Sequence, residues 1–479
     1  MPDLLDSQCL LTRRSLIAAA LLTTQVRPVW AAAGPILSVT DFGAKGLGDG
    51  HDDTQAIQSA IDSVAARGGG TVRFDAPRRY YALGDSLIMR PGVSLVGDGS
   101  YPTLRSTRSD RQLLFPGNFH PAFLEKLRYD FLAPYSSGTK VVRLANRSDA
   151  MRYCVGDQVV VADRRLGRTG TFGLAKHSWL NVVTAIRGDT ISLSQPIDVS
   201  VPAQMTRLAD GEGRRGIPLF FYSDAEISGL SFETLYHFTM DSAALNVRFL
   251  NNKVRSKSGL YGNAFQNVEW ARNNFEFTHM LGETSQNSFG CIIRDNTFRY
   301  VGGHRNKYDK TQYFGMYFQE YARNMRALRN RFILDDFNSQ NFCVSIALAQ
   351  NVIVDGLAVT GNAVPELIYM GAPSDPDFPV TGNFVKNCIF DTGQSDRFVM
   401  INGHDSQVMR DNGIIGCKFL GTTTAKDAIR IFRLAGNFQF KGNRWNGSGA
   451  CMTMGKSRTI DALDNTSENF AKAVCQAIN

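Results

Sequence analysis

The feature that most constrains the fold of this chain is a short phrase that recurs through its second half. Eight copies align so that their sixth residues form one column: Asn252, Asn273, Asn296, Asn330, Leu357, Cys388, Cys417 and Asn443. Their eighth residues form a second column, apolar and mostly aromatic: Val254, Phe275, Phe298, Phe332, Val359, Phe390, Phe419 and Trp445. Successive copies are 21 to 34 residues apart. A short alternating strand that recurs at such variable spacing is typical of a β-solenoid.

An asparagine column has a physical reason in such a fold. Coils of a parallel β-solenoid stack about 4.8 Å apart, so equivalent residues lie directly above one another. A buried amide then bonds to the amides above and below it and to the turn backbone, which satisfies its polar groups. Cys388 and Cys417 take the same position as small apolar substitutes, so we expect buried thiols there. The sequence therefore predicts an all-β parallel β-helix with an aromatic core.

The stretch TDFGAKGLGDGHDDTQAIQSAID, residues 40–62, predicts a helix that covers the open N-terminal end of this solenoid. Asp52 is a suitable N-cap, and Gln55 follows three residues later, as in a capping box. The segment TVRF is expected to begin the first strand. Aspartates at the helix start would repel a pyrophosphate, so the glycines before it do not predict a nucleotide site. The helix has one apolar stripe, formed by Ile57, Ala60, Ile61 and Val64.

Three segments carry a resemblance to a known family. They are VTDFGAKGLGDGHDDTQAIQSAID, GGGTVRF and RPGVSLVGDGSYPTL, the last ending at Leu104. Together they resemble the N-terminal signature, of the rhamnogalacturonase type, of the pectate-lyase-like β-helix superfamily. The resemblance implies a right-handed parallel β-helix with an N-terminal capping helix. It also implies a polysaccharide lyase, a glycoside hydrolase or a related carbohydrate-active protein, with substrate bound along the parallel sheets.

The chain is expected to divide into four parts. Residues 1–33 resemble a twin-arginine export signal, because Arg13 and Arg14 precede a short apolar run and a small-residue cleavage site. Residues 34–136 would form the N-terminal cap and first coils, 137–200 a small β insertion, and 201–479 the main β-helix with a C-terminal cap. The predicted location is therefore periplasmic or secreted.

The chain has a formal net charge of +8, which favours encounter with an acidic polysaccharide. No nucleic acid, nucleotide or stable membrane insertion is expected, and the oligomeric state is left open. The eight cysteines show neither a disulfide framework nor a zinc pattern. No metal site and no cofactor is predicted; calcium is optional, because no acidic cluster marks a site for it.

The longest interval between column asparagines, residues 296–330, contains a loop rich in titratable and aromatic residues. Counting six to ten residues beyond each column asparagine places groups from neighbouring coils on one edge of the solenoid. The catalytic candidates chosen in this way are His279, Glu283, His304, Arg305, Tyr308 and Asp309. The substrate-binding candidates are Lys307, Lys310, Tyr313 and Tyr317, since tyrosine faces stack on sugar rings and cations bind carboxylates.

These residue types favour β-elimination on a uronate-containing polymer. A cation near the uronate carboxylate acidifies the C5 proton, a base removes it, and an acid protonates the leaving oxygen. Arg305 and Lys310 suit the first task, and the histidines and Tyr308 suit the others. Two alternatives stay open: a glycoside hydrolase that uses Glu283 and Asp309, and a non-catalytic β-helix that binds envelope polysaccharide.

Overall fold

We analysed a computed structural model of the chain. It describes residues 34–115, 117, 128–163, 177–211, 219–238, 243–285, 287–301, 315–334, 342–361, 366–371, 378–403, 409–423, 427–432, 437–445, 451–454, 460–461, 466–467 and 474–475. The first predicted part, residues 1–33, lies outside this range, so the export signal remains a prediction. No helix among the described residues has the length and apolar character needed to cross a membrane.

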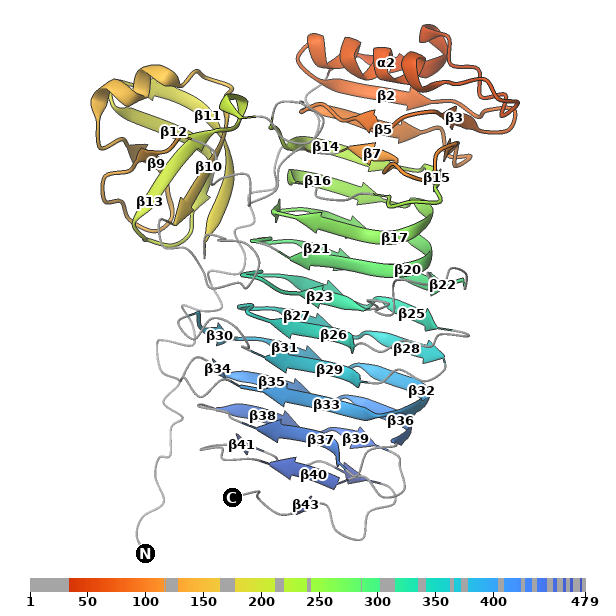
Figure 1. Cartoon of the computed structure of the whole chain (residues 1–479), viewed down its shortest axis with the longest axis vertical. Helices are drawn as coiled ribbons and strands as arrows, with labels where there is room; N and C mark the ends of the chain where they lie inside the picture. The colour runs from red at the N-terminus through yellow and green to blue at the C-terminus, as the bar shows by residue number, and fades with distance from the viewer. Residues whose placement is uncertain are drawn as a thin grey trace, which may run out of the picture.

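The described chain is a parallel β-helix, as the sequence predicted, with its coils stacked along the long axis in Figure 1. Two parallel sheets run along most of the stack, and a third accompanies them from the coil of β17 (Lys253–Asn263) onward. Sheet 1 contains β1 (Ile36–Ser38), β2 (Gly70–Phe74), β5 (Val93–Gly97), β14 (Tyr222–Ser228), β16 (Ala244–Leu250), β19 (Glu269–Ala271), β21 (Ile292–Arg294), β24 (Arg326–Leu328), β27 (Ile353–Asp355), β31 (Phe384–Lys386), β35 (Asn412–Ile415), β38 (Phe438–Lys441) and β41 (Ile460–Asp461).

Sheets 2 and 3 complete each coil. Sheet 2 contains β3 (Tyr81–Leu83), β6 (Thr103–Ser106), β15 (Ser231–Glu233), β17 (Lys253–Asn263), β20 (Asn274–Ser285), β22 (Thr297–Tyr300), β25 (Arg331–Leu334), β28 (Ala358–Gly361), β32 (Ile389–Ser395), β36 (Lys418–Thr423), β39 (Arg444–Trp445) and β42 (Thr466–Ser467). Sheet 3 continues the long strands β17 and β20 through β23 (Met316–Phe318), β26 (Phe342–Ala347), β29 (Glu366–Gly371), β33 (Arg397–Asn402), β37 (Asp427–Phe432), β40 (Cys451–Met454) and β43 (Val474–Cys475).

The asparagine column is a buried ladder between sheets 1 and 2. The backbone N–H of Asn252 donates to Oδ1 of Asn273 at 2.9 Å, and Asn273 donates in the same way to Asn296 at 2.8 Å. Asn296 continues the series to Asn330 at 3.1 Å. Each Nδ2 also donates to a backbone carbonyl of the preceding coil, so the amides satisfy one another as expected.

The two columns of the repeat confirm the predicted core. Cys388 and Cys417 are fully buried in the ladder position. In the aromatic column the rings of Phe275 and Phe298 lie 4.9 Å apart, stacked, and the ring of Phe332 follows at 5.3 Å, edge-on. Such pairs stabilise the core beyond the apolar area they bury.

Each coil turns into sheet 2 at one residue with positive φ, directly before the ladder position. This residue is Asn251 (φ 55°), Arg272 (φ 57°), Asp295 (φ 57°) and Arg329 (φ 50°) before the four ladder asparagines. In later coils it is Gly356, Asn387, Gly416 and Gly442. The left-handed conformation costs a side chain about 1 kcal/mol or more, so the ladder hydrogen bonds that follow help to hold the corner.

The helix α2 (Thr54–Ala66) covers the N-terminal end of the stack, at the top of Figure 1, and its predicted apolar stripe is fully buried. The predicted capping box is wrong. The N-cap is Asp53, whose carboxylate instead accepts from the backbone N–H groups of Lys45 and Gly46, at 2.7 and 3.2 Å. Gln55 bonds along the helix to Ser59. The strand TVRF is also not the first, since β1 precedes it and pairs with it.

The insertion forms a separate six-stranded antiparallel sheet beside the upper coils, at the left of Figure 1. In spatial order its strands are β8 (Asp130–Phe131), β13 (Ala203–Arg207), β10 (Gln158–Asp163), β11 (Ser178–Arg187), β12 (Thr190–Ile197) and β9 (Thr139–Arg143). It therefore spans a wider range than the predicted 137–200. Two short 3-10 helices, η3 (Arg147–Arg152) and η4 (Leu208–Asp210), accompany it, and it buries a core of its own around Trp179.

One buried ion pair joins the insertion to the β-helix. Arg323, on the connection from β23 to β24, is 2% exposed and lies 3.3 Å from a carboxylate oxygen of Asp198. Trp179 donates its indole N–H to the same carboxylate at 2.6 Å, and its ring lies beside the guanidinium. Nearby, Leu180 donates its backbone N–H to Gln266 of β18 (Phe265–Gln266) at 2.8 Å. The insertion is thus fixed at the edge where the chain leaves sheet 3.

Five further elements complete the described fold. The strands β4 (Leu87–Ile88) and β7 (Leu114–Phe115) pair with each other near the N-terminal end. The strands β30 (Val380–Thr381) and β34 (Met409–Arg410) pair on the connections from sheet 3 to sheet 1. The 3-10 helix η1 (Val39–Phe42) precedes α2. None of these interrupts the stacking of the three sheets.

Candidate functional site

The outer face of sheet 3 carries one aligned row of side chains, which we call the floor. Backbone register pairs Tyr317 with Ser345, Ser345 with Tyr369, Tyr369 with Met400, and Met400 with Arg430. The residues on either side of the first three point into the core, as Met316 and Phe318 do around Tyr317. Because side chains alternate along a strand, the floor residues face away from the core.

Glu283 continues this row toward the N-terminus in the backbone register. Its Cα partner on the preceding coil is Tyr261, and its partner on the next coil is Tyr317. The count of six to ten residues beyond the ladder thus aligns Tyr261 with Glu283. Across the longest interval the backbone partner of Glu283 is Tyr317, while His304 and Arg305 lie outside the described residues.

The structure describes the other predicted site residues only in part. His279 lies in β20, as Glu283 does, and the side chains of both are outside the described residues. Tyr317 is described and is 6% exposed. The remaining candidates all fall in residues 302–314, which lie outside the described range: His304, Arg305, Lys307, Tyr308, Asp309, Lys310 and Tyr313. In the sequence that segment lies between β22 of sheet 2 and β23 of sheet 3, the strand that contains Tyr317.

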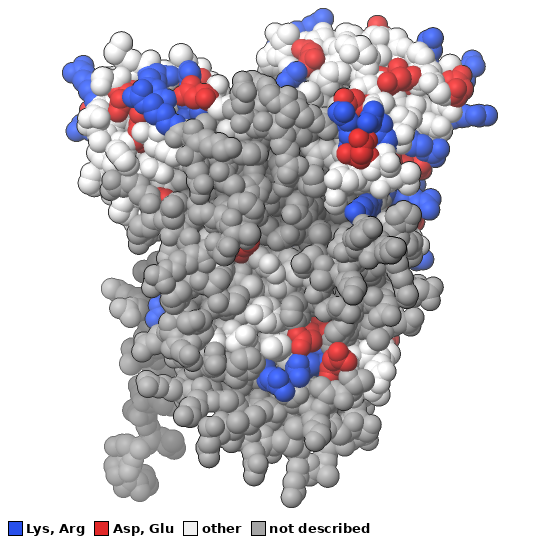
Figure 2. All heavy atoms as spheres, viewed as in Figure 1, with Lys and Arg blue, Asp and Glu red and all other residues white. Residues whose placement is uncertain are grey.

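Further along the floor, Glu366 and Arg397 form an ion pair on neighbouring coils. Nη1 of Arg397 lies 2.7 Å from Oε1 of Glu366, and the two side chains are only 13% and 16% exposed. Burial raises the pKa of the Glu366 carboxyl above its ordinary value, although Arg397 and Arg430 oppose that shift. Figure 2 shows acidic and basic side chains gathered here, over β29 and β33. This is a carboxyl that binds a proton more readily than an exposed glutamate does.

Tyr369 is oriented beside this pair by a glycine and an amide. A Cβ on Gly371 would lie 2.4 Å from the Tyr369 hydroxyl oxygen, so glycine leaves the space that the hydroxyl occupies. Asn402, the backbone partner of Gly371, hydrogen-bonds to that hydroxyl and favours its ionised form. Burial and the nearby Glu366 outweigh this contact and raise the pKa of Tyr369. At neutral pH the hydroxyl of Tyr369 is therefore protonated and can donate a hydrogen bond.

A second polar contact lies one coil earlier. Gln319 follows β23 and donates its side-chain amide to the hydroxyl of Ser345 at 3.0 Å. The polar groups on or beside the floor are therefore the Gln319 amide, the buried Ser345 hydroxyl, the Tyr369 phenol and the Arg430 guanidinium, with Met400 between the last two. This combination suits a hydroxyl-rich and carboxylate-bearing ligand.

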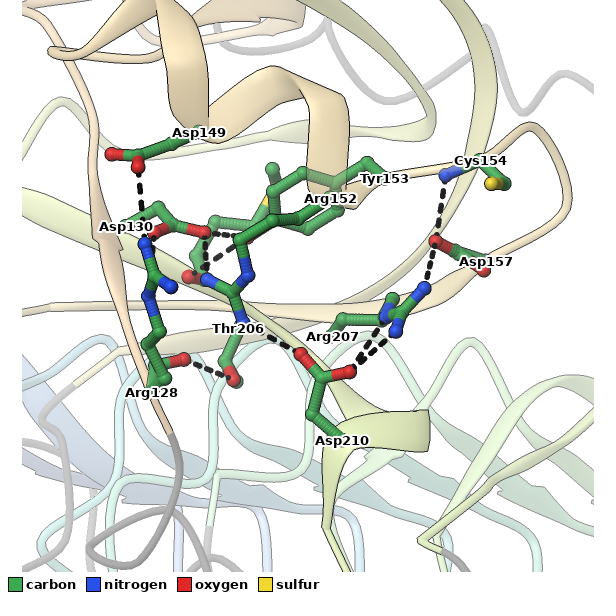
Figure 3. A network of polar contacts seen from close by, with 11 residues as sticks. Arg128, Asp130, Asp149, Arg152, Tyr153, Cys154, Asp157, Thr206, Arg207 and Asp210 are labelled. Carbon is green, nitrogen blue, oxygen red and sulfur yellow. Dashed lines mark hydrogen bonds and ion pairs between the residues drawn. The ribbon is translucent and has the colours of Figure 1, made fainter.

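The insertion contains a larger charged network, which is shown in Figure 3. Asp130 is 2% exposed and accepts from Arg152 at 2.6 Å and from the hydroxyl of Tyr153 at 2.7 Å. Arg152 continues to Asp210 at 2.6 Å, and Asp210 also pairs with Arg207. Each of these charges has an opposite charge within the insertion, so the network holds β8, η3, β13 and η4 together and is not our candidate site.

Among the described residues, no group of three or more histidine, cysteine, aspartate or glutamate side chains is placed to hold a metal ion. The expectation of an optional calcium ion is not tested by this observation.

Sequence reasoning missed Glu366, Tyr369, Arg397 and Arg430. The signal that could have found two of them is the alternation within two strands: ELIYMG and DAIRIF place Tyr369 and Arg430 between apolar residues, whereas RFVMIN has Met400 at the equivalent position. The asparagine column could not align these strands, because connections of variable length separate it from sheet 3.

Comparison with known proteins identifies the N-terminal region. Residues 36–119 match the family model "Rhamnogalacturonase A/epimerase, pectate lyase-like". The chain is 43% identical to alginate lyase 7 of Azotobacter vinelandii over 72 residues, which cover 14% of this chain and 8% of that protein. It is 45% identical to mannuronan C5-epimerase AlgE3 of the same organism over 75 residues, 14% of this chain and 4% of that protein. The chain thus spans less than a tenth of the length of these relatives.

Solved structures resemble the chain over most of its length. The tailspike protein of E. coli bacteriophage HK620, in complex with a hexasaccharide, matches with a TM-score of 0.51 at 11% sequence identity. The match covers 90% of this chain and 66% of that one. At this identity the likeness concerns the fold, and it agrees with the stacked parallel sheets described above.

Proposed function

We propose that the protein cleaves an acidic, uronate-containing polysaccharide, because residues 36–119 match the family model "Rhamnogalacturonase A/epimerase, pectate lyase-like". The proposed reaction is β-elimination, and the proposed site is the sheet 3 floor with residues 302–314, which precede β23 in the sequence. Two relatives are named for alginate and mannuronan, which are polymers of uronic acids. The basic character of the chain supports an acidic substrate.

The observation that carries the proposal is the backbone register of Glu283 with Tyr317 at the start of the floor. It brings one predicted catalytic residue next to the strand that immediately follows the predicted loop. In this proposal, residues from the 302–314 segment and from the floor bind the uronate together. Arg305 and Lys310 would neutralise its carboxylate, which acidifies the C5 proton. His304 or Tyr308 would then remove that proton, and His279 or Tyr308 would protonate the leaving oxygen.

C5 epimerisation is a second candidate, favoured by the likeness to mannuronan C5-epimerase AlgE3. It begins with the same removal of the C5 proton and ends with reprotonation from the opposite face, without loss of the leaving group. Hydrolysis by Glu283 and Asp309 is a third candidate, and binding without catalysis is a fourth. We also propose that the protein acts outside the cytoplasm, as the arginine pair at its N-terminus indicates.

One experiment separates these activities. Purified protein is incubated with alginate, mannuronan and polygalacturonate, and both reducing ends and the absorbance of unsaturated uronate are followed. β-Elimination produces both signals and hydrolysis only the first. Epimerisation produces neither but changes the uronate composition measured by NMR. The absence of all three changes on these polymers would contradict the proposed reaction and leave binding as the remaining role.

Replacement of loop residues tests the proposed site. Arg305→Ala and His304→Ala should each lower turnover by roughly 100-fold or more, as expected for the loss of a charge-stabilising or acid-base group. Lys441→Ala, on β38 of sheet 1, is the matched control for removal of a cation elsewhere on the β-helix. Wild-type turnover in both loop variants would exclude this loop from the chemistry.

A further inference from the structure

We propose that Tyr369, Asn402 and Arg430 form a uronate-binding subsite on the floor. The subsite begins at Tyr369, which lies two coils beyond Tyr317. The inference rests on the proposed function in that it assigns the same class of substrate. It differs from that proposal in its residues, which lie outside the predicted loop, and in its role, which is binding of a sugar away from the reacting bond.

The first argument is the direction in which the floor runs. Tyr317, Ser345, Tyr369, Met400 and Arg430 are consecutive partners on stacked coils. Their backbones are therefore about 4.8 Å apart along the axis of the β-helix. One pyranose ring of a polysaccharide spans a similar length. A chain that lies along the axis would thus place successive sugars over successive coils, and the sugar over the coil of Met400 would lie between Tyr369 and Arg430.

The second argument is that Tyr369 is held in one orientation. Gly371 leaves room for the phenol along the strand, and Asn402 bonds to its hydroxyl. A tyrosine fixed in this way loses little conformational entropy when a sugar binds. Its hydroxyl can donate to a sugar oxygen while its ring offers an apolar face.

The third argument is the distribution of charge. Arg397 is paired with Glu366 at 2.7 Å in a mostly buried position. Arg430 is partly exposed and lies two coils beyond Glu366. It brings a second guanidinium to the same face of the sheet. A guanidinium binds a carboxylate with paired hydrogen bonds, which a neutral sugar does not offer. The ligand that best fits these groups is a uronate residue.

The test measures binding and steady-state kinetics of the full chain. Binding of hexamers of mannuronate and of galacturonate is measured by calorimetry in the His304→Ala background, so that the oligomer stays intact. Arg430→Met and Tyr369→Phe should each weaken binding of the better uronate hexamer by about tenfold, the loss expected for a charged or well-oriented hydrogen bond. A neutral glucose hexamer should bind at least tenfold more weakly than that uronate hexamer.

Two further variants define the subsite more closely. Gly371→Ala should weaken binding as Tyr369→Phe does, because the added methyl group displaces the phenol from Asn402 without removing it. Lys418→Met is the matched control: Lys418 is an exposed cation on β36 of sheet 2, in the same coil as Arg430, and its loss should leave affinity unchanged. Thermal melting confirms that each variant is folded. In the catalytic background, Arg430→Met should raise KM about tenfold with kcat within twofold.

The outcomes keep the two proposals apart. If the wild type degrades no acidic polymer but Arg430→Met weakens hexamer binding, the reaction is wrong and the subsite stands. If the wild type cleaves the polymer while Arg430→Met and Tyr369→Phe bind as the wild type does, the reaction stands and the subsite is wrong. Failure of both uronate hexamers to bind, or equal binding of the neutral hexamer, also overturns the subsite.

Discussion

Asn273 lies directly over Asn296 on the next coil, and both of its N–H groups donate to the same oxygen. The backbone N–H of Asn273 is 2.8 Å from Oδ1 of Asn296, and its Nδ2 is 3.0 Å from that atom. Asn296 in turn donates to Asn330 and to the carbonyl of Trp270. One side-chain oxygen therefore satisfies two buried donors of the coil above it.

Asn296→Ala should consequently destabilise the fold strongly. The substitution leaves donors of Asn273 without a partner and opens a small cavity, which together predict a loss of roughly 2–4 kcal/mol in the free energy of unfolding. Urea unfolding checks the value. Glu276→Ala, on an exposed position of β20, is the control and should cost less than about 0.5 kcal/mol. Equal stability of the two variants would contradict the role of the ladder.

Asp53 and Asp52 should differ sharply in their contribution to stability. Asp53 is fully buried and accepts from the backbone of Lys45 and Gly46, so Asp53→Ala should cost about 2–3 kcal/mol. Asp52 is exposed and accepts from Thr54 and Gly84, so Asp52→Ala should cost about 1 kcal/mol. Thermal unfolding of the two variants side by side tests this order, and the reverse order would restore Asp52 as the principal cap.

The joint between insertion and β-helix predicts a coupled pair of substitutions. Asp198→Ala leaves the buried Arg323 guanidinium without its carboxylate and should cost roughly 3 kcal/mol. In the Arg323→Met background, the same change should cost at least 1 kcal/mol less, because no buried charge remains to be neutralised. A double-mutant cycle in urea measures the difference. Additive effects would mean that the ion pair does not fix the insertion.

Glu366 predicts a specific dependence of stability on pH. Its pKa in the folded protein is raised above the ordinary value of 4.5, so the native state holds this proton more tightly than the unfolded chain does. The protonated carboxyl contributes to the free energy of unfolding. This contribution is fully present below about pH 4.5 and is lost as the pH rises through the pKa of Glu366 in the folded protein. Relative to Glu366→Gln, the wild type should therefore lose stability as the pH rises from about 4.5 through the folded pKa. A gain over this range would contradict the raised pKa.

The fold was predictable where the sequence repeats locally. The ladder and aromatic columns share one short strand–corner–strand unit, so their spacing within each copy never changes. A second ladder, in which Asn383 accepts from Val352 and Asn412 accepts from Asn383, was not predicted. Its corner carries apolar residues in earlier coils, such as Cys291 and Met325, so no amide pattern marks it.

The candidate site was predictable only up to its first coil. Tyr261 and Glu283 follow their ladder asparagines within one unbroken strand, so counting aligned them correctly. In later coils a connection of variable length precedes sheet 3, and the register of Tyr369 and Arg430 depends on where that connection ends. Similarly, Asp53 and Asp52 are adjacent in sequence, and only the packing of α2 decides which carboxylate is buried.

The positive-φ corner before each ladder position has a consequence for how such a protein diversifies. Since this corner and the ladder behind it set the pitch, the connections into and out of sheet 3 can lengthen without moving the coils. The six-stranded insertion, which enters between β7 and β14 and leaves the pairing of β5 with β14 intact, is an instance. Loop length adds little to the entropic cost of closure. New loops could thus be acquired or exchanged one coil at a time, changing recognition while the scaffold stays the same.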